Sequence, residues 1–283
     1  MSASRTPARR RRPAFAQLML LLTRYRQLTW EMTRREISER YAGQMLGSVW
    51  AIGHPVLLMG LYVFIFAYVF PTRLGLTEDM PRSFVVYILA GLIPWITFAD
   101  AMNKSTVVVI GNASLVKQVA FPLEVLPVKV VLAACVTQLV ATPILLGYAL
   151  FVDPSGLPWT VALLPVLFLL QLLAMIGVAY LLAAATVYLR DLREIVQVFT
   201  TAGLFLAPIL YLPTWVEHAW PPLRWVLLLN PFSHLVWCYQ DLLYFGRIEH
   251  PVSWIVLMTL STALFYLGFR VFQRLRVLFG DFL

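Results

Sequence analysis

The sequence is poor in charged residues and contains few cysteines. Only 13% of its 283 residues are Asp, Glu, Lys or Arg, against roughly a quarter in ordinary soluble domains, and 60% are hydrophobic. This composition argues against a soluble globular protein and predicts one embedded in a membrane. The two cysteines, Cys135 and Cys238, lie in separate apolar runs without a Cys-x-x-Cys spacing. We interpret them as packing residues rather than as a disulfide or a metal site.

Motifs that would indicate an enzyme are also absent. No G-x-x-x-x-G-K-[ST] phosphate loop occurs, which argues against nucleotide binding in the usual way, and there is no G-x-S-x-G, H-E-x-x-H or D-x-D. The histidines have no partner at metal-ligand spacing; they are His54, His218, His234 and His250. We therefore expect no cofactor, no metal and no catalytic residue on this chain.

Long apolar runs dominate what is present. A membrane-spanning helix needs about 20 mostly apolar residues, so runs of that length bounded by charged or turn residues are candidate spans. Six such runs extend approximately from Gly47 to Phe70, Phe84 to Met102, Leu126 to Phe151, Trp159 to Leu189, Ile195 to Leu212 and Val252 to Phe272. The sequence predicts an all-α polytopic membrane protein, with a six-span transmembrane domain over residues 47–283.

The basic residues are distributed unevenly around these runs. With this topology, all of the 22 Lys and Arg residues fall on one side of the membrane except Arg73, Arg82, Arg224 and Arg247. Because cytoplasmic segments carry the excess of Lys and Arg, both termini should lie in the cytoplasm. We accordingly expect a multi-pass protein of the cytoplasmic (inner) membrane.

The segment from Pro213 to Pro251 is too apolar for an ordinary loop, and two interpretations are open. A seventh span over Leu223 to Phe245 would place the arginines near the C-terminus outside the cell. The Asn-Pro-Phe sequence at 230–232 interrupts that run, however, because proline removes a helix donor. We favour outer gate helices at about 213–250, two short re-entrant helices that dip into the membrane from outside and return.

Residues 1–46 precede the first span and are rich in arginine, and we expect them to form a cytoplasmic basic arm, an amphipathic interfacial helix and a gate region. Residues 1–13 have the composition of a basic arm, which we expect to be retained because no signal-peptide cleavage pattern follows. Five apolar residues then recur at helical spacing: Phe15, Leu18, Met19, Leu22 and Tyr25. This spacing predicts an amphipathic helix over about 14–30 that lies on the cytoplasmic membrane surface, with its arginines near anionic headgroups. A disordered arm is the alternative.

Few ionisable residues fall near the predicted spans. Asp100 lies four residues before Lys104, a spacing that allows an ion pair within one helix. Lys129 stands close to the start of its span, where a lysine can extend its amine to the interface. A proton-coupled carrier would be expected to place a carboxylate or histidine at mid-membrane, and only His54, beside Pro55, comes near. This scarcity argues against a secondary transporter.

Four stretches carry short motifs in a fixed order. They are RREISERYAGQMLGSVWAIGHPVLL at 34–58, AGLIPWITFADAMNKSTVVVIGNASLVKQVAFPLEVLPV at 90–128, VYLRDLREIVQVFTTAGLFLAPILYLP at 187–213 and LNPFSHLVWCYQDLLYFG at 229–246. The motifs are R-Y-x-x-x-x-L-G-x-x-W, G-L-I-P-W, N-x-x-L-V-K-x-x-x-F-P, R-D and L-N-P. Together they resemble the permease subunit of type-2 ATP-binding-cassette exporters of polysaccharides and polyol phosphates, the class that moves O antigens, teichoic acids and some capsules.

This resemblance implies a homodimer of six-span subunits, paired with two copies of a separate ABC ATPase that would bind ATP and Mg. It also implies that the substrate is a glycan attached to a polyprenyl diphosphate carrier. A type-2 exporter of a drug or lipid is the nearest alternative. From another class, a membrane-embedded transferase would need an acid/base pair that the sequence does not display. The basic stretch beside the first span could suggest nucleic-acid binding. Because it adjoins a membrane span, contact with lipid headgroups or an anionic substrate is the simpler interpretation.

Residues before the first span are candidates for contact with the carrier diphosphate. Guanidinium groups suit bidentate contact with phosphate, and this stretch would lie at the cytoplasmic entrance. The candidates are Arg34, Arg35, Arg40 and Tyr41. Simple positive-inside anchoring is the alternative explanation for their charge.

Aromatic residues of the spans are candidates for a channel lining on which sugar rings slide. They are Tyr62, Phe66, Trp95, Phe199, Phe205 and Tyr211. Packing or lipid-facing aromatics would look the same in a single sequence. At the end of the fourth run, Arg190 and Asp191 are predicted to cap or pair and so to hold a structural corner, with ATPase contact as a secondary role.

The stretch GNASLVKQVAFPLEVLP at 111–127 interrupts the apolar chain on the predicted cytoplasmic side. Asn or Ser can cap a short helix there, and Phe-Pro would end it. We expect a coupling helix at about 111–122 that docks into an ATPase groove, with a plain connecting loop as the alternative. Its candidate contact residues are Asn112, Ser114, Leu115, Val116, Lys117, Val119, Phe121 and Pro122. The resembling family often has a second basic residue where this chain has Gln118.

Overall fold

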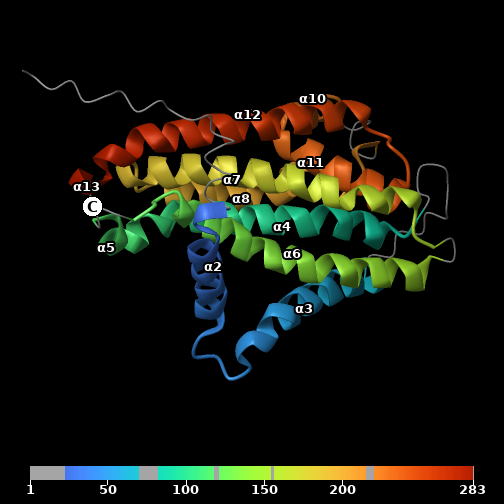
Figure 1. The fold of residues 1–283 in the computed structure, drawn as a ribbon. Coiled ribbons are helices and arrows are strands. Elements are labelled where there is room, and N and C mark those ends of the chain that lie inside the picture. Colours follow the sequence, from blue (N-terminus) through green and yellow to red (C-terminus); the bar gives the residue numbers. More distant parts are fainter. Residues whose placement is uncertain (1–22, 70–81, 118–120, 154–155, 215–219, 283) are drawn as a thin grey trace, which may run out of the picture.

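The computed structural model describes residues 23–69, 82–117, 121–153, 156–214 and 220–282. Every regular element within these ranges is helical, and most of the long helices lie side by side in one bundle (Figure 1). The all-α prediction is confirmed.

Five helices are long and apolar enough to cross a membrane, among the residues described. They are α3, Trp50–Phe64, which a π turn extends to Val69; α4, Phe84–Val108; α6, Val125–Val152; α7, Leu164–Tyr188, preceded by a 3-10 turn from Trp159; and α12, Pro251–Leu275, followed by a 3-10 turn to Leu278. The chain is thus a multi-pass membrane protein. These helices correspond to the first, second, third, fourth and sixth predicted spans.

The fifth predicted span, Ile195 to Leu212, is only partly helical. Its helix α8, Leu192–Leu206, has 15 residues and ends before Pro208. At 1.5 Å per residue, such a helix rises roughly 22 Å, less than a hydrocarbon core of about 30 Å. The count of six spans therefore stays a prediction.

The apolar segment before α12 forms two short helices and not a seventh span. Helix α10, Leu223–Leu229, ends at Asn230, and α11, Pro231–Gln240, begins directly after it and continues as a π turn to Phe245. The Asn230 side chain caps α11 by accepting a hydrogen bond from the backbone N–H of Phe232, at 3.0 Å. The predicted interruption at 230–232 is confirmed, and α11 packs inside the bundle against α4 and α12.

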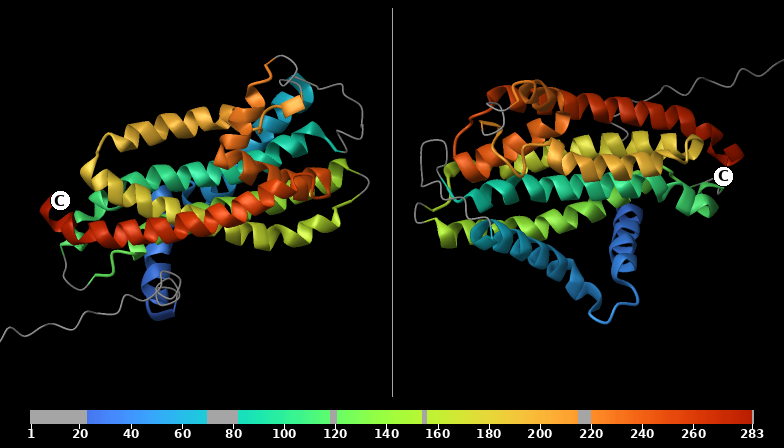
Figure 2. Two further views of the ribbon diagram at one scale, coloured as in Figure 1. Left: turned by 90° about the horizontal axis from the view of Figure 1, so that it is seen from above. Right: turned by 180° about the vertical axis from the view of Figure 1, so that it is seen from behind.

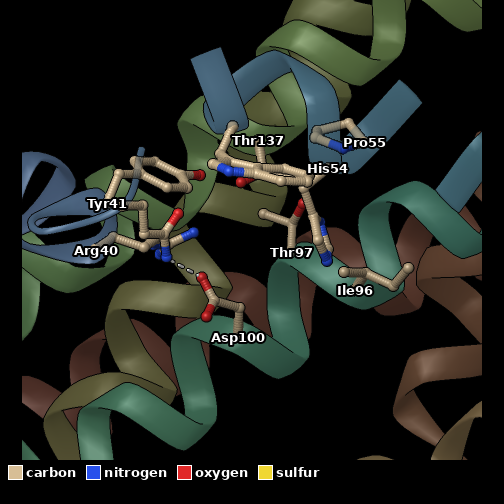
Figure 3. A pocket seen from close by; sticks show the side chains of 10 residues that line it. Arg40, Tyr41, His54, Pro55, Ile96, Thr97, Asp100 and Thr137 are labelled. Atoms are coloured by element: carbon tan, nitrogen blue, oxygen red, sulfur yellow. Dashed lines mark hydrogen bonds and ion pairs between the residues drawn. The ribbon is translucent and has the colours of Figure 1, made fainter. Parts of the chain in front are cut away.

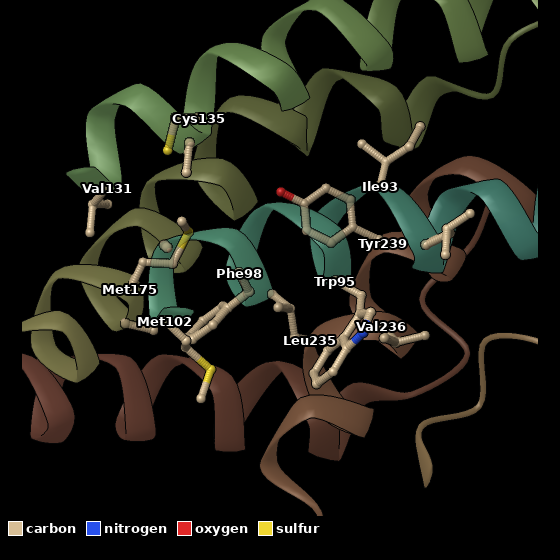
Figure 4. Close-up of a cluster of buried hydrophobic side chains, with 14 of the residues drawn as sticks. Ile93, Trp95, Phe98, Met102, Val131, Cys135, Met175, Leu235, Val236 and Tyr239 are labelled. Carbon is tan, nitrogen blue, oxygen red and sulfur yellow. The ribbon is translucent and has the colours of Figure 1, made fainter. Parts of the chain in front are cut away.

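Helix α4 lies at the centre of the hydrophobic core (Figure 4). Its residues from Phe84 to Trp95 are all buried, as expected for a helix that is apolar on every side. Side chains of α6, α7 and α11 pack around it. Cys135 and Cys238 are buried and unbonded to each other, which confirms that they are packing residues.

Helices α7 and α12 make a close backbone contact through glycine. A Cβ atom on Gly268 would lie 2.1 Å from the backbone oxygen of Gly177, and one on Gly177 would lie 2.5 Å from the backbone of Leu264. Small residues at such a point let two backbones approach one another within a membrane. We call this contact the α7–α12 seam.

Helix α2, Arg26–Tyr41, projects from the side of the bundle, and α3 returns from its far end (Figures 1 and 2). The sequence predicted a helix over about 14–30, of which residues up to 22 lie outside the described ranges. The described helix instead continues to Tyr41, through the polar stretch WEMTRREISERY. A bend at Tyr25 precedes α2, so residues 26–30 of the predicted helix belong to α2, whose polar residues pair with the bundle. The interfacial helix before Tyr25 stays a prediction.

Candidate functional site

A cavity of about 530 Å³ lies beneath the turn that joins α2 to α3 (Figure 3). Its walls come from α2, α3, α4, α6 and the turn itself, and its lining residues are Arg40, Tyr41, Gln44, Trp50, His54, Pro55, Ile96, Thr97, Asp100 and Thr137. Charged and amide groups occupy one part of this lining, whereas Trp50, Pro55 and Ile96 supply apolar walls. The cavity lining therefore combines charged and polar groups with apolar surface.

An ion pair lies in the polar part of the cavity lining. The Arg40 Nη2 atom donates a hydrogen bond to Asp100 Oδ2 at 2.7 Å, and the two side chains are 22% and 31% exposed (Figure 3). This contact joins α2 to α4. The expected pair between Asp100 and Lys104 is not formed, because α2 brings a guanidinium to the carboxylate from another part of the chain.

A second ionic cluster lies one helical turn from this ion pair, along α2 and along α4, and includes a lysine of α6. The Glu36 carboxylate of α2 is 3.1 Å from the amine of Lys129 on α6 and 3.8 Å from that of Lys104 on α4. The Lys129 side chain is only 8% exposed. Lys129 therefore meets a carboxylate inside the protein instead of extending to the interface as expected.

The four residues predicted to meet a carrier diphosphate are divided by the structure. Arg40 and Tyr41 line the cavity. Arg34 is exposed, and Arg35 is exposed and pairs with Glu39 at 2.6 Å, a contact that raises the pKa of the guanidinium. Neither Arg34 nor Arg35 contributes to the cavity, since both lie on other sides of α2.

The predicted coupling segment forms two short turns between α4 and α6. A 3-10 turn covers Ile110–Asn112, and α5 covers only Ala113–Val116, so the helix is much shorter than the expected 111–122. Asn112 is the N-cap residue, but its side chain donates to the Val108 carbonyl at 2.7 Å rather than capping α5. Ser114 lies inside α5, so neither predicted side-chain cap forms.

The coupling segment also faces differently from the prediction. Leu115, Val116 and Phe121 are partly buried against the core of this chain. Among the described residues of this segment, Gly111, Ser114 and Lys117 are exposed, at intervals of three residues. Pro122 is half-buried beside Phe121, and Val119 lies outside the described residues.

At the same end of the bundle, Glu124 holds the segment to the C-terminal helix. Its carboxylate accepts hydrogen bonds from Gln273, at 2.6 Å, and from Arg276, while Tyr180 of α7 donates to its backbone carbonyl at 3.1 Å. Sequence reasoning missed Glu124. The available signal was a lone carboxylate at the start of an apolar run in a protein with few acids.

The corner at Arg190 and Asp191 is made by backbone hydrogen bonds. Asp191 occupies the N-cap position of α8 without a side-chain cap, and its carbonyl accepts the Glu194 N–H at 3.1 Å. Both side chains are exposed, and neither has an ion pair with a described residue. The predicted side-chain cap or pair was wrong, because the turn itself satisfies the backbone.

The aromatic residues proposed as a channel lining have dissimilar surroundings. Trp95 is 2% exposed in the core and its ring lies against Gly203 of α8. The remaining five are Tyr62 and Phe66, which stack on one another; Phe199, beside Phe232; Tyr211, packed on Trp237; and Phe205, which is 62% exposed. In this conformation Trp95 is a packing residue, whereas Phe205 lies on an open face.

Comparison with known proteins identifies the family to which this chain belongs. The model of the ABC-2 type transporter family matches residues 27–244, which include α2, the cavity and the coupling segment. This chain belongs to the ABC-2 type transporter family. The resemblance carried by the four motif stretches is thereby confirmed.

Named relatives align with this ABC-2 family member over most of their length. The O-antigen export system permease protein RfbA of Myxococcus xanthus is 31% identical, over 94% of this chain and 98% of its own. A protein of the same name from Klebsiella pneumoniae is 26% identical, over 89% and 93%. The polysialic acid transport protein KpsM of Escherichia coli is 25% identical, over 84% and 90%. The chain is therefore a transporter component.

Proposed function

We propose that this chain is the membrane-spanning permease subunit of an ATP-driven exporter, and that its substrate is a polysaccharide linked to a polyprenyl diphosphate. The named relatives support a polysaccharide as cargo, since two of the three are O-antigen permeases and the third transports polysialic acid. ATP and Mg would bind to a separate ATPase subunit, because this sequence has no phosphate loop.

The cavity beneath α2 is the observation that carries the carrier-lipid part of this proposal. Arg40 offers a planar cation to a diphosphate, and Tyr41 offers a hydroxyl beside it. Trp50 and Ile96 offer apolar surface for the first isoprene units. The cavity thus matches a ligand with a charged head and an apolar tail.

Two arginines on the same helix provide the test. Arg40→Gln should lower the affinity of the purified chain for farnesyl diphosphate by about tenfold or more, because it removes a charge-assisted bidentate contact. Arg35→Gln is the matched control, since Arg35 lies on α2 but outside the cavity. Export of lipid-linked polysaccharide by cells that carry each variant should follow the same order. Equal losses in both variants would contradict the cavity as the binding site.

We also propose that the coupling segment transmits force from the ATPase. Its free face consists of Gly111, Ser114 and Lys117, because the apolar side packs on this chain. Lys117→Glu should reduce export and substrate-stimulated ATP hydrolysis together, by about tenfold, because it reverses the charge of this exposed face. Leu115→Asp should instead destabilise the chain itself. Arg224→Glu, an exposed reversal on α10, is the control and should leave coupling unchanged.

A homodimer is the third part of the proposal. Helix α8 exposes several apolar residues, namely Ile195, Val198, Phe205 and Leu206. Lipid or a second copy can cover this face. Because Cys135 and Cys238 are buried, single cysteines can report on proximity. Val198→Cys should crosslink between subunits, whereas Ile255→Cys, exposed on α12, should not; crosslinking through α12 alone would contradict this interface.

The orientation follows from the charge asymmetry of the sequence. Both termini, α5 and the α7–α8 corner would lie in the cytoplasm, and α10 would lie on the outer side of the inner membrane. The cavity then opens near the cytoplasmic leaflet, where a lipid-linked glycan is loaded. Labelling of single cysteines at Lys117 and Arg247 from either side of sealed vesicles tests this orientation.

A further inference from the structure

In the cavity, the Asp100 carboxylate is paired with Arg40, the cation that we propose binds the substrate diphosphate. We propose that Asp100 is a built-in competitor for Arg40, and that it exchanges Arg40 for Lys104 when an anionic ligand binds. This inference rests on the proposed diphosphate site and adds to it a residue that sets which anions remain bound.

The arrangement of charges on α2 and α4 permits this exchange. Glu36 and Arg40 are one helical turn apart on α2, and Lys104 and Asp100 are one turn apart on α4. The two helices therefore present opposite charges in matching order, with Glu36 near Lys104 and Arg40 on Asp100. Residues four apart on a helix are neighbours, so a change of rotamer brings the Asp100 carboxylate to Lys104.

Lys104 is available as the second partner. Its amine is 3.8 Å from Glu36, whereas Lys129 is closer to the same carboxylate, at 3.1 Å. If Asp100 moves to Lys104, Glu36 keeps Lys129 and Arg40 receives the incoming anion. Every charge in the cluster has a partner both before and after binding, so the exchange leaves no buried ion alone.

The competitor has a consequence for selectivity. A ligand must displace Asp100 before it can contact Arg40. The apparent affinity for every anion is therefore the intrinsic affinity multiplied by the fraction of time that Arg40 is free. Monoanionic phospholipids surround a helix at the membrane surface, and this reduction keeps their occupancy of Arg40 low. A diphosphate has more charge and more acceptor oxygens, so it retains enough affinity to bind. Asp100 thereby suppresses occupation by bulk lipid.

Ligand affinity in three variants tests the exchange. The purified full-length chain in nanodiscs of neutral lipid is titrated with farnesyl diphosphate and, separately, with phosphatidylglycerol mixed into the disc. Asp100→Asn keeps the shape and removes the charge, and it should raise the affinity for both probes by about twofold to fivefold. Lys104→Gln should lower the affinity, because Asp100 then has no alternative partner. Asp191→Asn, an exposed carboxylate distant from the cavity, should change neither.

The double variant Asp100→Asn/Lys104→Gln separates exchange from simple attraction. The loss caused by Lys104→Gln should be much smaller once Asp100 is neutral, since Lys104 acts through that carboxylate. An equal loss in both backgrounds would overturn the exchange, and an unchanged or lower affinity in Asp100→Asn would overturn the competitor. If Asp100 had a purely structural role, Asp100→Asn would lower the affinity for the ligand instead of raising it.

Arg40→Gln distinguishes this inference from the proposed function. If it leaves farnesyl diphosphate binding unchanged, the diphosphate site itself is wrong. If Arg40→Gln weakens binding while Asp100→Asn does not strengthen it, the site stands and only the competitor fails. Thermal unfolding of each variant checks that the chain is folded. Should Asp100→Asn unfold, Asp100→Ala replaces it in the same titrations and in the double variant, with the same expected and contradicting outcomes.

Discussion

The α7–α12 seam and the attachment of α2 show two ways of joining helices in one membrane protein. At the seam, Gly177 and Gly268 let two backbones touch, and no side chain intervenes. Helix α2 instead meets the bundle through Glu36 and Arg40, whose partners are the charged residues of α4 and α6. The close glycine contact permits only one arrangement of α7 and α12, whereas the ion pairs that hold α2 can exchange partners.

This difference indicates which parts of the chain stay fixed and which can move. A glycine contact loses its dispersion energy as soon as the helices separate, so the seam is suited to a rigid frame. Charges at the edge of a cavity can be transferred to a ligand, and α2 is suited to respond to one. The cavity has α2 as one wall and is otherwise lined by α3, α4 and α6, so only its α2 wall is held by ion pairs to the bundle.

The largest effect is expected at the seam. Gly268→Ala should destabilise the chain by more than about 3 kcal/mol, because the new methyl group meets a backbone oxygen that no rotamer change can move. Thermal unfolding in detergent measures the loss. Gly147→Ala on α6 is the matched control, since a Cβ there meets nothing within 4 Å. Similar unfolding temperatures for both variants would show that the backbone contact at Gly268 does not stabilise the chain more than an open position does.

An intermediate effect is expected at the attachment of α2. Glu36→Gln should cost about 1–3 kcal/mol, because it leaves the poorly exposed Lys129 without its carboxylate. Hydrogen exchange should rise in α2 and stay low in α7 and α12. If protection falls equally along all three helices, α2 is part of the same cooperative unit as the seam.

The smallest effect is expected for the exposed pair on α2. Arg35→Gln breaks the contact with Glu39, yet both side chains are more than half exposed, and solvent screens such pairs. Neither the unfolding temperature nor the exchange of α2 should change measurably. A shift as large as that of Glu36→Gln would show that local helix stability, rather than attachment to the bundle, governs α2.

Much of the fold was predictable because local composition carries it. Long apolar runs located the five long helices, and the proline of the Asn-Pro-Phe sequence predicted the break between α10 and α11. The coupling segment was found between the correct helices, but its facing was not. Apolar residues at 115 and 116 suit a partner groove or the chain's own core equally well, and only the packed structure distinguishes these.

The site was less predictable, because its residues are distant in sequence. Arg40 and Asp100 are 60 residues apart, and no spacing rule connects them. Sequence reasoning grouped Arg40 with Arg34 and Arg35, which share its chemistry but not its direction from α2. It likewise treated Trp95 as a lining residue, although Gly203 lets α8 cover the ring.

The sequence by itself determined a helical membrane protein, its order of helices and the motifs of its family, because hydrophobicity, proline and charge asymmetry act locally along the chain. Tertiary structure decided which arginine faces a cavity, which carboxylate occupies it and which side of the coupling segment is free. Those choices depend on how α2, α4 and α6 approach one another, and electrostatic partners are selected by distance in space rather than by spacing in sequence.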